Sequence, residues 1–306
     1  MEMTFLFPGQ GSQKVGMGAD FFEKFEMARR RFDEANDILG RDLKKICFEG
    51  PPEELTQTRN TQPALFVTEA AICDVLQENG ITPALALGHS LGEYGALYAA
   101  GVYSFADGVR IVAKRGELMG EAGTVAPGAM AAVIGLARET IAEVLSSIES
   151  GTVVPANENA PEQTVISGDV EAVKAACGKL QAAGAKRVVD LPVSGAFHSP
   201  LMQQAADQFA TFIASYEFRE ARCEIIPNVT AQRTKDSGQI RDLLVKQLVS
   251  LVRWVDAMAL IAGEGAVNCV EVGPGSVLKG LARKCDPGIS VAACATVDNL
   301  YSLTNS

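Results

Sequence analysis

Short apolar runs and longer amphipathic stretches alternate along the first part of the chain. Apolar residues recur at helical spacing in the longer stretches, whereas the short apolar runs predict strands. In chain order, the pattern predicts a strand at 4–7, helices at 20–39 and 63–79, a strand at 84–87, and helices at 93–100 and 105–119. Strands that alternate with helices in this way are typical of a parallel α/β sheet.

The pattern changes between roughly residues 124 and 194. It predicts there a strand at 129–134, a helix at 139–147, strands at 152–156 and 163–167, a helix at 170–183 and a strand at 187–191. This β-α-β-β-α-β order is typical of a ferredoxin-like unit. We therefore predict an α/β protein with a parallel-sheet large domain (1–123 and 195–306) and an inserted ferredoxin-like small domain (124–194). The boundary between the two domains would form the cleft that holds a site.

The rest of the large domain carries further elements. They are predicted as a helix at 201–215, a strand near 225–226, a helix at 240–251, a strand at 269–272 and a last helix after the loop at 273–275. We expect the tail after Asp298 to be dispensable.

A serine framed by glycines follows the predicted strand at 84–87, in the sequence Gly88-His89-Ser90-Leu91-Gly92. In a nucleophile elbow, glycines let the reactive residue adopt a strained backbone angle and let the following helix pack closely. The Ser90 hydroxyl would then be exposed at a helix N-terminus, where N–H groups can bind an oxyanion. Such a turn makes the large domain hydrolase-like. The pattern alone also arises by chance, so the strand-turn-helix context carries the prediction.

Histidine is the usual base that activates a serine near neutral pH, and the chain has two histidines. His89 adjoins Ser90 in the elbow, so its side chain should point elsewhere. His198 is therefore the candidate base, and it precedes Ser199 and Pro200, which can cap and open a helix. The alternative is a histidine that only makes hydrogen bonds near a helix start.

Composition and charge argue against several classes of protein. Lys and Arg number 27 against 37 Asp and Glu, so the net charge is −10 and we expect no nucleic-acid partner. The seven cysteines are scattered and never spaced CxxC, which argues against a disulfide framework or a zinc site and fits a reducing cytoplasm. With no basic, apolar leader and no apolar run long enough to span a bilayer, we expect neither export nor membrane insertion. The loop at 8–13 lacks the ending of a P-loop, so nucleotide binding is a weak alternative.

Several segments match one protein family in the family's order along essentially the whole chain. They are 7–13 (FPGQGSQ), 61–65 (TQPAL), 88–94 (GHSLGEY), 115–116 (RG), 195–202 (GAFHSPLM) and 271–275 (EVGPG). Through them the sequence resembles the malonyl-CoA:acyl carrier protein transacylases, the acyltransferases that load malonyl groups for fatty acid synthesis. The resemblance implies ping-pong malonyl transfer in the cytoplasm, with malonyl-CoA as substrate and no bound cofactor.

The resemblance also implies roles for individual residues. Ser90 would be acylated by malonyl-CoA, and His198 would act first as base and then as acid. The backbone N–H groups of Leu91 and Gln10 would hold the oxyanion. Arg115 would pair with the malonate carboxylate, because a carboxylate in a partly dry cleft needs a planar, permanently charged, bidentate partner. Without the resemblance, Arg115 would be read as an ordinary surface arginine.

Three further positions match the family near its site. Phe197 corresponds to the motif form associated with malonyl rather than methylmalonyl, and its ring would exclude the extra methyl group; the alternative is a core phenylalanine. The backbone carbonyl of Gln247 would orient His198, and Asn157 would lie near the substrate. Leu251 stands where a proline is common, which leaves the loop around Gln247 less certain.

The resemblance implies an acyl carrier protein as partner, and we expect a monomer without metal. The carrier is acidic, so we expect a basic docking patch near the cleft in spite of the net charge. Its candidates are Lys186, Arg187, Lys279, Arg283 and Lys284, each of which is otherwise an ordinary solvated charge.

Two other functions stay open. A discrete, trans-acting malonyltransferase of a polyketide synthase would use the same chemistry with another carrier. A serine hydrolase would use the same elbow and dyad, but a hydrolase of neutral esters has no need of Arg115. A binding module without activity is disfavoured by the intact pair of Ser90 and His198.

Overall fold

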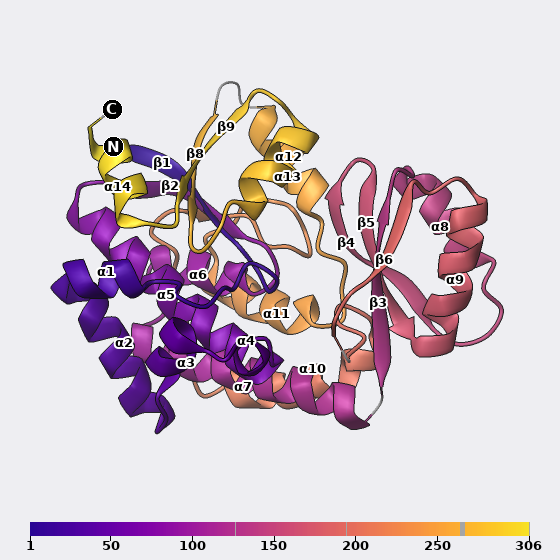
Figure 1. Ribbon diagram of the computed structural model, residues 1–306, viewed down its shortest axis with the longest axis horizontal. Coiled ribbons are helices and arrows are strands. Elements are labelled where there is room, and N and C mark those ends of the chain that lie inside the picture. The colour runs from indigo at the N-terminus through magenta and orange to yellow at the C-terminus, as the bar shows by residue number, and fades with distance from the viewer. Residues whose placement is uncertain (126, 194, 264–266, 306) are drawn as a thin grey trace.

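Two β-sheets organise the part of the chain that the structure describes (Figure 1). The structure is a computed structural model and describes residues 1–125, 127–193, 195–263 and 267–305. The larger sheet is parallel, has the strand order β7-β2-β1-β8-β9, and consists of β1 (Glu2–Phe7), β2 (Thr82–Gly88), β7 (Glu224–Ile225), β8 (Val267–Val272) and β9 (Ile289–Cys294). The smaller sheet is antiparallel, has the order β4-β5-β3-β6, and consists of β3 (Gly128–Ile134), β4 (Val153–Ala160), β5 (Gln163–Asp169) and β6 (Arg187–Asp190).

Helices cover both sheets. Around the parallel sheet lie α1 (Ala19–Lys24), α2 (Glu26–Leu39), α3 (Leu43–Glu49), α4 (Pro52–Leu55), α5 (Thr58–Glu78), α6 (Gly92–Ala99), α7 (Phe105–Val125), the 3₁₀ helix Pro200–Met202, α10 (Gln203–Ile213), α11 (Ser237–Gln247), α12 (Trp254–Ala262), α13 (Val277–Cys285) and α14 (Val297–Thr304). Beside the antiparallel sheet lie α8 (Arg138–Ser146) and α9 (Val170–Ala182). No helix in the described ranges has both the length and the apolar character needed to cross a membrane.

Both faces of the parallel sheet are buried, as the central strand β1 shows. Phe5 and Phe7 pack into the cluster formed with α5, α6 and α7, whereas Leu6 packs into the cluster formed with α12 and α13. Successive side chains of a strand point to opposite faces, so an entirely apolar strand needs helices on both sides. The predicted α/β class with a parallel sheet is confirmed.

The antiparallel sheet forms the other end of the molecule, with α8 and α9 on its outer face (Figure 1). Ala131 and Val133 from β3 pack with Ile141 of α8 and Leu180 of α9 in a separate apolar cluster. The strand order and the order of the elements along the chain confirm the ferredoxin-like unit. The boundaries of the two domains stay a prediction, and residues 194 and 306, which end the predicted segments, lie outside the described residues.

Two helices differ from the predicted ones near the N-terminus. The helix predicted over 20–39 is divided into α1 and α2, because Phe25 is extended (φ −118°, ψ 127°). The helix predicted to begin at Pro63 begins at Thr58. Proline has no N–H to donate, and the Arg59 carbonyl, four residues before it, instead accepts from the Arg41 guanidinium at 3.1 Å.

The C-terminal part contains two further corrections. The helix predicted over 240–251 ends at Gln247, which leaves that residue's carbonyl at a helix end. The helix predicted after the loop at 273–275 is confirmed as α13, but it is not the last element, because β9 pairs with β8 at the edge of the sheet and α14 follows it, so the tail after Asp298 belongs to a helix. Leu300 of α14 is buried in the core, at 1% exposure.

Candidate active site

Ser90 lies in the turn between β2 and α6, with its backbone in the left-handed region at φ 52°. A Cβ atom at Gly88 would lie 2.0 Å from the carbonyl carbon of Gly92, and one at Gly92 would lie 1.9 Å from the Phe7 carbonyl oxygen. Close backbone approach therefore requires both glycines. The Asn228 side chain supports the turn: it accepts the Ser90 N–H at 2.7 Å and donates to the Gly88 carbonyl at 2.6 Å.

His198 faces the serine from a distant part of the chain. Its Nε2 lies 2.8 Å from Ser90 Oγ, and its Nδ1 lies 2.8 Å from the backbone carbonyl oxygen of Gln247. A carbonyl only accepts, so Nδ1 carries the proton and Nε2 is free to accept the serine O–H. Ser199 caps the following 3₁₀ helix, where its Oγ accepts the Leu201 N–H. The imidazole is thus held at a rigid helix boundary.

The environment of His198 favours its neutral form. Burial, followed by the nearby charge of Arg115, lowers the pKa of His198 to about 3. A neutral imidazole at physiological pH can take a proton from Ser90, so the pair has the arrangement of an activated nucleophile.

Arg115 is buried against the same serine rather than exposed on the surface. It belongs to α7, is 1% exposed, and lies 5.2 Å over the Tyr94 ring. Its Nη1 donates to Gln62 Oε1 at 2.8 Å, and its Nη2 donates to Gln247 Oε1 at 2.9 Å and to Ser90 Oγ at 3.2 Å. A fully buried guanidinium without a carboxylate in contact is costly, which points to an anionic ligand beside the serine.

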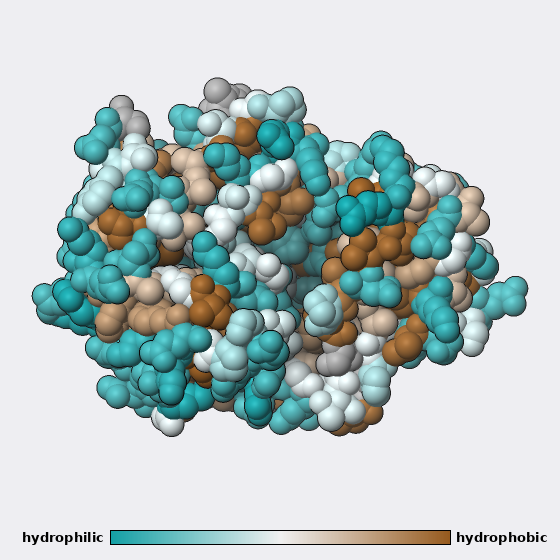
Figure 2. Space-filling model, in the orientation of Figure 1, coloured by the Kyte–Doolittle hydropathy of each residue, from teal (hydrophilic) through white to brown (hydrophobic). Residues whose placement is uncertain are grey.

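These groups line one small pocket of about 100 Å³. Its lining residues are Gln10, Gln62, His89, Ser90, Arg115, Met119, Met130, Asn157, Leu191, Val193, Phe197 and His198. Some of these residues belong to the part of the molecule built on the parallel sheet, and others belong to the part built on the antiparallel sheet. The space-filling view shows that the surface is hollowed between these two parts (Figure 2). The structure therefore brings together every candidate side chain that the sequence indicated around Ser90, including Asn157 from β4 and the buried ring of Phe197.

Comparison with known proteins assigns the family. The family described as "Acyl transferase domain" matches residues 4–296. The chain belongs to this acyl transferase family. It is 42% identical to the malonyl CoA-acyl carrier protein transacylase of Bacillus subtilis (strain 168) over 301 residues, which are 98% of this chain and 95% of that protein.

Solved structures of this acyl transferase fold agree closely with the chain. An acyl carrier protein S-malonyltransferase from Vibrio cholerae is 41% identical, has a TM-score of 0.95, and is matched over 98% of this chain and 99% of that one. A malonyl-transacylase in complex with a type II polyketide synthase acyl-carrier protein is also 41% identical, with a TM-score of 0.95 over 100% and 99% of the two chains. The chain is therefore an acyltransferase.

The backbone donors expected for an oxyanion lie at the start of α6 and in the loop after β1. Leu91 is the residue directly before α6, and Gln10 lines the pocket with Ser90. Neither backbone N–H has an acceptor among the described residues.

His89 does not contact the serine hydroxyl. Its Nε2 lies 2.7 Å from Asn159 Oδ1 and its ring packs 5.5 Å from the Trp254 ring, although the side chain also borders the pocket. The expectation that it points away from the nucleophile agrees with these contacts.

Three polar residues of the site had no role in the sequence reasoning. Gln62 and Glu93 lie inside the matched segments, so their place in those segments was the available signal. Asn228 gave no signal, because it follows β7 in a loop and reaches Ser90 only through the fold.

In the described part of the chain, no cluster of His, Cys, Asp and Glu is arranged to hold a metal, and all seven cysteines are free thiols.

Proposed function

We propose that this acyltransferase moves a malonyl group from malonyl-CoA to the phosphopantetheine thiol of an acyl carrier protein, through a malonyl ester on Ser90. The observation that carries the proposal is the buried guanidinium of Arg115, whose Nη2 lies 3.2 Å from the Ser90 hydroxyl. A malonyl group is an acyl group with a free carboxylate, so it needs a nucleophile and a cation side by side. The Bacillus subtilis relative and the Vibrio cholerae structure quoted above carry this activity in their names.

The first half-reaction forms the acyl-serine. His198 Nε2 takes the proton of Ser90 Oγ as the oxygen attacks the thioester carbonyl carbon. The resulting oxyanion is held by the N–H groups of Leu91 and Gln10. When the C–S bond breaks, the sulfur leaves with the proton from His198 as coenzyme A thiol. The second half-reaction runs the same steps in reverse order with the carrier's thiol.

Arg115 selects the carboxylate-bearing donor. Its planar fork can bind both carboxylate oxygens, and its hydrogen bonds to Gln62 and Gln247 fix its plane. Phe197 lines the acyl site and would exclude the methyl group of methylmalonyl, a discrimination of about 1–3 kcal/mol. We infer that Asn157, which is 6% exposed and lines the same pocket, contacts the substrate.

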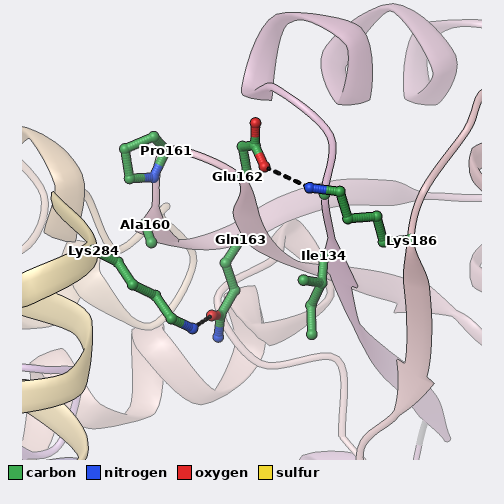
Figure 3. A pocket seen from close by; sticks show the side chains of 8 residues that line it. Ile134, Ala160, Pro161, Glu162, Gln163, Lys186 and Lys284 are labelled. Atoms are coloured by element: carbon green, nitrogen blue, oxygen red, sulfur yellow. Dashed lines mark hydrogen bonds and ion pairs between the residues drawn. The ribbon is translucent and has the colours of Figure 1, made fainter.

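We further propose that the carrier docks where the two parts of the molecule meet. Lys186 and Lys284 line one surface groove, Lys186 beside the antiparallel sheet and Lys284 on α13 (Figure 3). Lys284 Nζ donates to Gln163 Oε1 at 2.8 Å, and Lys186 Nζ lies 3.3 Å from a carboxylate oxygen of Glu162. Exposed lysines held by such weak pairs can exchange them for the carboxylates of an acidic carrier. Arg187 on β6 and Lys279 and Arg283 on α13 would extend this docking patch.

A carrier of polyketide synthesis is the second candidate, favoured by the similarity to the malonyl-transacylase solved with such a carrier. The chemistry at Ser90 is the same in both cases, so only the relative kcat/KM for the two carriers distinguishes them. We also propose that the enzyme acts as a monomer, without bound cofactor, in a reducing cytoplasm where its seven thiols stay free.

Intact mass spectrometry after mixing with malonyl-CoA tests the proposal directly. We expect the wild-type chain to gain the mass of one malonyl group and to lose it again when a carrier with a free phosphopantetheine thiol is added. A chain that consumes malonyl-CoA only by releasing malonate to water, with no acylated carrier, would be a hydrolase.

A further inference from the structure

We propose that Glu93 is a positioning residue, which accepts a hydrogen bond from the Gln247 side-chain amide and thereby keeps the oxygen of that amide turned toward Arg115. The inference rests on the proposed function and deepens it, because Arg115 is there the partner of the substrate carboxylate. Glu93 itself does not line the pocket and would not touch the substrate.

The contacts form a short relay beneath the nucleophile. Glu93 lies in the first turn of α6, is 1% exposed, and its Oε2 accepts from Gln247 Nε2 at 2.8 Å and from the Asn228 N–H at 3.0 Å. Gln247 Nε2 also donates to the Ser90 carbonyl at 3.0 Å. On its other side, Gln247 Oε1 accepts from Arg115 Nη2 at 2.9 Å.

The orientation of this amide decides whether Arg115 is held. A guanidinium only donates, so it requires the oxygen of Gln247 and not the nitrogen. With the amide turned over, Nε2 would face the Arg115 donors, and Oε1 would face the acceptors Glu93 and the Ser90 carbonyl. Donors would then face donors at one end of the amide and acceptors would face acceptors at the other, so both hydrogen bonds would be lost. Buried polar groups without partners are costly. The acceptors on the nitrogen side, which are Glu93 and the Ser90 carbonyl and, at the longer distance of 3.4 Å, Asn228 Oδ1, therefore fix the guanidinium at the far end of the relay.

Glu93 can act in this way without its charge. Burial raises the pKa of Glu93 to about 7, while the hydrogen bonds from Asn228 and Gln247 and the charge of Arg115 oppose the shift. Both hydrogen bonds use the same oxygen, Oε2, and a neutral carboxyl or amide oxygen can accept them equally. A glutamine at position 93 preserves this acceptor, whereas a methionine fills the same volume without one.

The chain offers a matched control. Glu69 of α5 is a second fully buried carboxyl group, and neither of its oxygens has a hydrogen-bond partner among the described residues. Burial and the nearby Glu271 raise the pKa of Glu69 well above its usual range, so Glu69→Gln replaces a neutral group by a neutral group of the same shape. The variant Glu69→Gln therefore shows what the loss of a buried carboxyl group does when that group makes no hydrogen bond to Gln247.

The experiment measures kcat/KM for acylation of Ser90 by malonyl-CoA and by acetyl-CoA, which has no carboxylate. We expect Glu93→Met to lower the malonyl value by about tenfold or more and the acetyl value much less, because a lost hydrogen bond to a charged network has effects of this order. Glu93→Gln should keep the malonyl-to-acetyl ratio within about threefold of wild type. Glu69→Gln should leave both values unchanged.

The outcomes separate the two hypotheses. A wild-type chain that malonyl-CoA does not acylate overturns the proposed function, whatever the variants do. With wild type acylated, an unchanged donor ratio in folded Glu93→Met overturns the positioning role, and so does an equal loss in Glu93→Gln. Should Glu93→Met not fold, Glu93→Asp keeps the carboxyl group but moves its oxygens away from Gln247 by the length of one methylene. The same loss of donor selectivity is then expected, and an unchanged ratio overturns the inference.

Discussion

The replacement Arg115→Ala tests what gives the site its preference for malonyl. The guanidinium is 1% exposed, and it donates to Gln62, Gln247 and Ser90 Oγ. Its loss would leave a malonyl carboxylate in a pocket of about 100 Å³ without a cation. Truncating one partner of a buried charge pair typically costs about 2–5 kcal/mol, so the malonyl kcat/KM should fall by about 30-fold to 5,000-fold.

An acetyl donor should be affected far less by the same change. Acetyl-CoA has no carboxylate, so it loses only the hydrogen bond between Arg115 and Ser90 Oγ, with a net value of about 0.5–1.5 kcal/mol or roughly 2-fold to 13-fold. The assay is transfer from each donor to one carrier, with thermal unfolding as a check on the fold. Arg110→Ala is the control, because this arginine lies on the same helix but is exposed, and its ion pair is a long one with Asp107 at 3.6 Å. Equal losses for malonyl and acetyl would refute the assignment and make Arg115 a structural residue.

Three further predictions concern the nucleophile, the base and the docking patch. Ser90→Ala should abolish the malonyl adduct in intact mass spectra, and an adduct in this variant would place the nucleophile elsewhere. His198→Ala should slow acylation by about 10²–10⁴-fold. Since the pKa of His198 is lowered to about 3, the imidazole stays neutral from pH 7 to 5, and the wild-type kcat/KM should show no acid limb near pH 6.5; such a limb would contradict the burial argument. Reversing Lys186 and Lys284 to glutamate should raise the KM for the carrier and flatten its salt dependence without changing acylation by malonyl-CoA, whereas an unaltered carrier KM would move the docking surface.

The parts of the site that the residues predicted without the family resemblance are those encoded locally. Gly88 and Gly92 frame Ser90 within five residues, so the strand, the turn and the helix that follow one another in sequence also build the elbow. The fold class was predictable for a similar reason, because buried parallel strands read as short apolar runs between helical periods. Both signals depend on neighbours along the chain.

What could not be predicted depends on contacts between distant segments. Asn228 and Ser90 are 138 positions apart, and nothing around Asn228 marks it as a support for the elbow. Only the family resemblance indicated the role of the Gln247 carbonyl, because that role depends on where α11 ends, and apolar periodicity extended that helix to residue 251. A carbonyl within a helix would be bonded to an N–H four residues later, whereas the Gln247 carbonyl at the helix end accepts from His198 at 2.8 Å and from the Ser250 N–H at 3.4 Å. Apolar periodicity determines the ends of helices least well, and here the end of α11 is the feature that matters for function.

The proposed nucleophile and the proposed base are both held by strained backbone that the surrounding network stabilises. Ser90 and His198 are two of the three non-glycine residues with positive φ in the described ranges, at 52° and 58°. Such a conformation costs about 1–3 kcal/mol and persists only where neighbouring groups determine it. Asn228 fixes the Ser90 N–H, and Gln247 contacts both the Ser90 carbonyl and the His198 ring. Because one glutamine joins the nucleophile, the base and, through its side chain, Arg115, a change in this network displaces all three together. Substitutions there should therefore combine less than additively with Ser90→Ala or His198→Ala, as expected for residues that act as a unit.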